Sequence, residues 1–124
     1  MYRTANTLPE QIRSKSVDLL NRHLAAAVDL HAQVKQAHWN VRGPTFIAIH
    51  ELFDKVADAV EDYSDKIAER AGTLGGTAEG TVQTAAERSF LEPYWLGYRR
   101  CRGAHRGGDG GARELRGIGA QRDR

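Results

Sequence analysis

Five side chains in the middle of this 124-residue sequence have the types and spacing of metal ligands. His38 and His50 lie twelve positions apart, and Asp54, Asp65 and Glu69 follow the second histidine. On a helix with about 100° per residue, His50 and the three carboxylates fall within an arc of about 100°. They form two pairs at i,i+4 spacing, and each pair can hold one ion. Imidazole and carboxylate ligands without a thiolate suit iron, manganese or zinc rather than copper(I).

The same acidic face also has a simpler interpretation. Amphipathic helices expose a charged face to solvent, opposite the apolar face that packs on the core. The stretch carries four further acids, which add to this side: Glu51, Asp58, Glu61 and Asp62. Acidity alone therefore favours a solvated surface over a metal site.

The spacing of the carboxylates favours a site shared by two chains. Asp54 and Asp65 are eleven residues apart, which is about 16 Å along a helix, so one ion cannot reach both within one chain. The pairs His50/Glu69 and Asp54/Asp65 share one midpoint, between residues 59 and 60. Two antiparallel copies related by a two-fold axis there would join the members of each pair in two identical sites. His38 is placed to add a second imidazole, and a cation would offset the cost of burying the acids.

Two long helices are expected to position these residues. Apolar residues recur at helical spacing from 12 to 41, and Gly43 and Pro44 end that helix. Thr45 is expected to cap a second helix over residues 46–71, and a short helix is predicted over residues 82–88. No strand pattern occurs, so the sequence predicts an all-α protein.

Each long helix has one apolar stripe. The first stripe consists of Leu20, Leu24, Ala27, Val34 and Ala37, with His31 and His38 on the same side. The second consists of Ile49, Phe53, Val56, Val60 and Ile67, with Leu52 and Tyr63 at its margin. Two such helices are half of a bundle, so we expect other helices or subunits to cover the remaining apolar surface.

Composition divides the chain in two. Residues 1–95 carry ten Lys and Arg against thirteen Asp and Glu, whereas residues 96–124 carry eight Arg, no Lys and three acids. A single cysteine, Cys101, excludes an internal disulfide and a cysteine zinc site within one chain. The sequence has no apolar run of membrane-spanning length and no signal-peptide pattern, so we expect a soluble cytoplasmic protein with one domain.

The segment HWNVRGPTFIAIHELFDKVADAVEDYSDKIAER resembles the signature of the Dps family (DNA protection during starvation), the mini-ferritins. The resemblance covers about residues 12–94 and includes LEPY near its end. It implies that His38, His50 and Asp54 are iron ligands from one subunit, and that Asp65 and Glu69 come from its two-fold neighbour. Trp39 matches the family's tryptophan beside that site.

The resemblance also implies a fold, an activity and partners. The subunit would be a ferritin-like four-helix bundle that assembles into a hollow dodecamer. The assembly would act as a ferroxidase, oxidising Fe(II) preferentially with hydrogen peroxide and storing the ferric mineral, and many members also coat DNA in the nucleoid. Two alternatives remain open: a non-enzymatic nucleoid protein that compacts DNA, and a fragment without activity.

Residues 96–124 depart from the family pattern. They are rich in Arg and Gly where two further bundle helices are expected. One interpretation is a disordered basic tail that binds DNA phosphates. The other is a reading-frame error, because suitable synonymous codons for residues 100–124 permit an amphipathic helix in a shifted frame. Under the second interpretation, a chain with the printed tail forms no soluble shell, whereas a frame-restored gene does.

Overall fold

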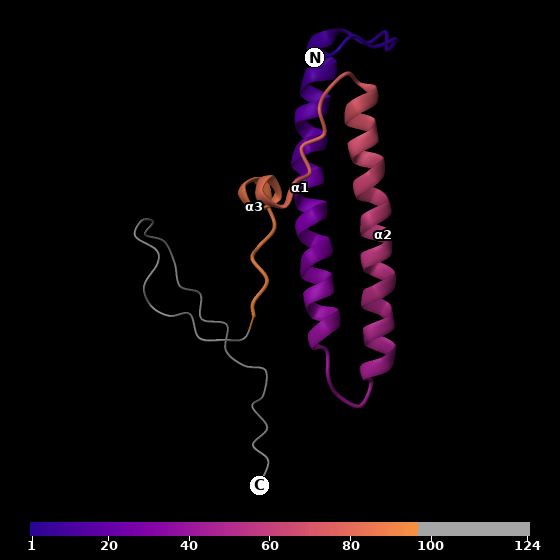
Figure 1. Cartoon of the computed structure of the whole chain (residues 1–124), viewed down its shortest axis with the longest axis vertical. Helices are drawn as coiled ribbons and strands as arrows, with labels where there is room; N and C mark the ends of the chain where they lie inside the picture. The colour runs from indigo at the N-terminus through magenta and orange to yellow at the C-terminus, as the bar shows by residue number, and fades with distance from the viewer. Residues whose placement is uncertain (97–124) are drawn as a thin grey trace, which may run out of the picture.

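The computed structural model describes residues 1–96, which form three helices (Figure 1). Helix α1 spans Glu10–Asn40, α2 spans Phe46–Thr73 and α3 spans Val82–Arg88. The first two run antiparallel, side by side, and α3 contacts α1 but not α2. The described part contains no strand, which confirms the all-α prediction. The predicted segment 96–124 falls, apart from Leu96, outside the described residues.

The predicted helix limits are close to the observed ones. Helix α1 begins two residues before the predicted start and ends one residue before the predicted end. Helix α2 begins at Phe46 as predicted and continues two residues beyond Ala71. Gly72 therefore lies inside its last turn. Helix α3 has the predicted bounds. Across residues 1–96, none of the helices combines the length and apolar character that crossing a membrane requires.

The predicted cap at Thr45 is wrong in one respect. Thr45 occupies the N-cap position of α2, but its hydroxyl makes no capping hydrogen bond. The first turn is held by main-chain carbonyls instead: Gly43 O accepts from Phe46 N at 3.1 Å, and Thr45 O accepts from Ile49 N at 3.3 Å. Gly43 has φ 120°, a conformation that other residues rarely adopt.

Small side chains form the contact between the helices. The buried apolar residues of the described chain are Val17, Leu24, Ala25, Ala26, Ala57, Ala71, Leu74 and Ala85. Of the five apolar residues predicted to face the core from α1, only Leu24 is fully buried. On α2, none of the five predicted residues is fully buried, and Val56 is 38% exposed. Alanines lie at the contact because small side chains let two helices approach closely, so the larger residues are left at its flanks.

Large apolar side chains remain on the surface of this helix pair. Leu19, Leu30, Leu52 and Tyr63 are each at least 40% exposed. Most apolar side chains of long helices are covered in a finished bundle. The pair therefore has the uncovered surface expected of half a bundle.

The N-terminal residues are attached to the end of α2. Tyr2 N donates a hydrogen bond to Gly75 O at 2.6 Å, and Thr4 Oγ1 donates to Thr73 O at 3.0 Å. Arg13 Nη1 donates to Leu74 O at 2.9 Å. These donors satisfy the last carbonyl of α2, which lacks a partner within the helix, and two carbonyls of the turn that follows it. Residues 1–4 thus hold the turn after α2 in place.

The connection from α2 to α3 runs along α1 (Figure 1). The buried side chain of Asn21 uses both of its polar groups there. Its amide donates to Thr77 O and its carbonyl oxygen accepts from Glu79 N, each at 3.0 Å. Beyond α3, Ser89 Oγ donates to Asp29 Oδ2 at 2.6 Å. Polar side chains of α1 therefore fix both ends of the α3 segment.

Candidate metal centre

The turn between α1 and α2 brings His38 and His50 into contact. Their rings stack with centroids 3.6 Å apart and planes 24° apart. His38 lies in the last turn of α1 and is buried, and His50 lies one turn into α2 and is half-buried. The sequence placed these two imidazoles in one site, and the structure does bring them together.

Each histidine bonds to the backbone of the other. His38 Nδ1 donates to His50 O at 2.9 Å, and His50 Nδ1 donates to His38 O at 3.1 Å. A carbonyl oxygen only accepts, so both Nδ1 atoms carry a proton. In the neutral rings both Nε2 atoms then keep their lone pairs. This is the arrangement found around metal-bound histidines, whose second nitrogen is usually held by a carbonyl or carboxylate.

Asp54 is the third predicted ligand that lies in this cluster. Its Oδ1 is 3.6 Å from His38 Nδ1 and 2.7 Å from Lys35 Nζ. The hydrogen bond from Lys35 lowers the pKa of Asp54 most strongly; charge on Lys35 and the two histidines acts in the same direction, and desolvation opposes it. Asp54 is therefore an ionised carboxylate at neutral pH. An ion bound at its Oδ1 would compete with the Lys35 ammonium group for that oxygen.

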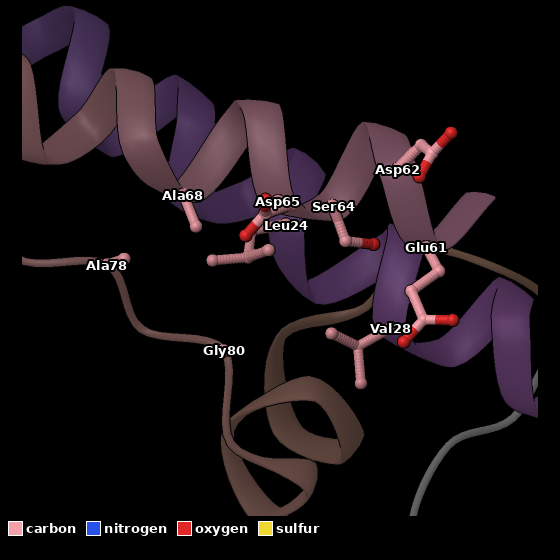
Figure 2. Close-up of a pocket in the computed structure, with 9 residues that line it drawn as sticks. All are labelled: Leu24, Val28, Glu61, Asp62, Ser64, Asp65, Ala68, Ala78 and Gly80. Carbon is pink, nitrogen blue, oxygen red and sulfur yellow. The ribbon is translucent and has the colours of Figure 1, made fainter. Parts of the chain in front are cut away.

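Asp65 and Glu69 lie elsewhere on α2. Asp65 is three turns after Asp54, about 16 Å along the helix, and it lines an open groove of about 500 Å³ between α1, α2 and the connection to α3 (Figure 2). Glu61 and Asp62 line the same groove, whose apolar residues include Leu24 and Val28. Glu69 is exposed.

One chain does not assemble the five predicted ligands. Within residues 1–96, no three His, Cys, Asp or Glu side chains are arranged to hold a metal ion. The predicted set is split between a cluster of His38, His50 and Asp54 and the separate pair of Asp65 and Glu69. The five-ligand site stays a prediction that requires a second chain.

Two residues of this region were not identified from the sequence. Lys35 binds Asp54, and its position three residues before His38 places it on the same helix face. Phe46 contacts the His50 ring, with centroids 5.0 Å apart, and lies four residues before it. The spacing of Lys35 and His38 and that of Phe46 and His50 could have indicated both contacts from the sequence. Trp39, predicted to lie beside the site, follows His38 in α1 and is 67% exposed.

Comparisons with known proteins agree with this architecture. The profile of the ferritin family, described as a ferritin-like domain, matches residues 17–96. The DNA protection during starvation protein of Agrobacterium fabrum is 43% identical over 93 residues, which is 75% of this chain and 57% of that protein. The protein of the same name from Mycolicibacterium smegmatis is 42% identical over 81 residues, or 63% of this chain and 44% of its own.

Solved structures show the same likeness. The tetragonal form of Mycobacterium smegmatis Dps superimposes with a TM-score of 0.73 at 35% identity, over 77% of this chain and 58% of that one. DpsA14 from Streptomyces coelicolor superimposes with a TM-score of 0.72 at 38% identity, over 77% of this chain and 56% of that one. The chain thus spans about half the length of the relatives that it matches.

Proposed function

Because this chain belongs to the Dps family of ferritin-like proteins, we propose that it is a ferroxidase and iron-storage mini-ferritin. It oxidises Fe(II), preferentially with hydrogen peroxide, and so protects DNA from oxidative damage. The observation that carries this proposal is the His38/His50 pair beside Asp54. Two imidazoles with free Nε2 atoms next to an ionised carboxylate form half of a hard, iron-binding ligand set.

The ligand chemistry favours oxidation of the bound metal. Carboxylate oxygens are hard ligands that stabilise Fe(III) more than Fe(II). Hydrogen peroxide takes one electron from each of two Fe(II) ions and, with two protons, leaves as two water molecules. Because each peroxide molecule accepts two electrons, no hydroxyl radical is released. Fe(II) is the substrate here, and Fe(III) is the cargo that is stored.

The complete site requires a second subunit. An antiparallel dimer with its axis near residues 59–60 would bring the partner's Asp65 and the partner's Glu69 to His38, His50 and Asp54. Such a contact is self-complementary, as a two-fold dimer needs. The exposed apolar residues of α1 and α2 support further assembly, which we propose reaches the dodecamer of the family.

The test is peroxide-driven oxidation of Fe(II), followed by stopped-flow absorbance on the metal-free protein. The double variant Asp54→Ala/Glu69→Ala should lose the fast phase while it keeps its helical circular dichroism. Glu87→Ala is the matched control, because it removes an exposed acid of α3, which does not contact α2 and holds none of the predicted ligands. Fast oxidation by the double variant would contradict the assignment.

A second candidate function is non-enzymatic DNA binding. Residues 96–124 carry eight Arg against three acids, and such a segment can bind phosphates by counterion release. This function predicts DNA retention that falls steeply with salt and disappears when residues 96–124 are removed. Equal retention by the truncated chain would exclude the segment as the DNA-binding element. A sizing column distinguishes both functions from an unassembled, inactive chain.

A further inference from the structure

Three aromatic rings meet where α1 ends and α2 begins. Phe46 is the first residue of α2, and its ring centroid is 5.0 Å from that of His50, with the planes 36° apart. His50 in turn stacks on His38 at 3.6 Å. Ring pairs at 4.5–7 Å attract each other beyond the area that they bury. The imidazole of His50 thus has an aromatic contact with each of the two helices.

The orientation of His50 depends on one hydrogen bond between the helices. Its Nδ1 donates to His38 O, which is one of the last four carbonyls of α1 and has no partner within the helix. His50 is only half-buried, so part of its side chain already faces solvent. A rotated ring would lose the bond to His38 O, and either nitrogen could then carry the proton. Iron would meet a ligand with no fixed donor atom.

We propose that Phe46 is a positioning residue for the metal site. Its ring holds the His50 imidazole against His38, so that Nδ1 keeps its proton on the His38 carbonyl and Nε2 presents a lone pair. Phe46 itself touches no metal and acts only through His50. The inference rests on the proposed iron site for its purpose, but the positioning is a property of the metal-free chain.

The experiment is histidine-selective ¹⁵N NMR on the full, metal-free chain at about pH 8, above the ordinary imidazole value of about 6.5. The wild-type spectrum should show His50 with its proton on Nδ1. In Phe46→Ala the fraction with the proton on Nε2 should rise by about three- to ten-fold, the range that an aromatic pair contributes. Phe46→Tyr keeps the ring and should restore the wild-type spectrum. Ile47→Ala removes the adjacent exposed side chain, which makes no ring contact with either histidine, and should change nothing.

Fe(II) affinity under anaerobic conditions gives the second readout. It should weaken about three- to ten-fold in Phe46→Ala and be restored in Phe46→Tyr. If Phe46→Ala loses its helical signal, Phe46→Leu replaces it, because leucine fills space without a flat ring. A wild-type His50 spectrum in the Ala or Leu variant would overturn the positioning role. A wild-type chain that fails to oxidise Fe(II) while Phe46→Ala still changes the tautomer would refute the iron function and leave the positioning of His50 supported.

Discussion

Gly76 packs against the side of α1, and replacement by alanine should destabilise the fold. A Cβ added there would lie 2.4 Å from Val17 Cγ1, 2.6 Å from Cγ2 and 3.1 Å from Cβ. Carbon atoms in contact normally lie about 3.5–4.0 Å apart, so the connection would have to move by about 1 Å. Val17 cannot yield easily, because it is β-branched and buried with Ala71 and Leu74. Overpacking of this kind costs about 1–3 kcal/mol of unfolding free energy.

Gly72, four residues before Gly76, gives a matched control. It lies in the last turn of α2, and a Cβ there would meet nothing within 4 Å. Gly72→Ala should therefore raise the free energy of unfolding by up to about 1 kcal/mol through helix propensity. Urea unfolding followed by circular dichroism, on the full chain at one protein concentration, measures both variants. The reasoning is refuted if Gly76→Ala is as stable as the wild type, because the connection would then not run along Val17.

Three further predictions concern single contacts. Lys35→Met should raise the pKa of Asp54, which a ¹³C carboxyl titration measures. Because the native pKa of Asp54 is depressed, the Lys35–Asp54 pair stabilises the fold above about pH 3.9, and this stabilisation is lost as the pH falls through the native pKa. The stability of the variant should therefore depend less on pH in this range. Thr4→Val removes the bond to Thr73 O and should lower the unfolding free energy by about 0.5–1.5 kcal/mol, whereas Thr7→Val, at an exposed position, should not. Thr81→Ala removes the side-chain cap of α3, which accepts from Thr84 N, and should cost about 1 kcal/mol. Amide exchange should then speed up in α3 and stay unchanged in the middle of α2.

The helices could be predicted from the sequence because their signals are local. Gly43 and Pro44 end the first helix by chain geometry alone, and periodic apolar residues mark its extent. The prediction of which residues of α2 face α1 was less accurate. Periodicity identifies an apolar arc, but it does not say that Ala57 rather than Val56 lies against α1. That choice follows from how closely the two helices approach.

The sequence predicted that His38, His50 and Asp54 lie together, which they do, but it did not predict the hydrogen bonds around them. Their role as metal ligands stays a prediction. The reciprocal bonds to the two backbone carbonyls depend on the path of the turn at residues 41–45, which no residue pattern encodes. The contact between Lys35 and Asp54 joins residues nineteen apart and likewise needs the folded hairpin. Asp65 and Glu69 can reach this cluster only through a second chain.

Complementation between two inactive variants tests the shared site most directly. Asp54→Ala and Glu69→Ala should each abolish fast Fe(II) oxidation by peroxide. When the two chains are co-expressed, each mixed dimer regains one intact site, because one chain supplies Asp54 and its partner supplies Glu69. Random pairing of two chains should restore about a quarter of the wild-type sites. Co-expression of Asp54→Ala with His50→Ala is the control and should restore none, since both changes lie in the same half of the site. Recovery of about a quarter in the first mixture alone is the predicted result, and no recovery in either mixture would contradict a site built from two chains.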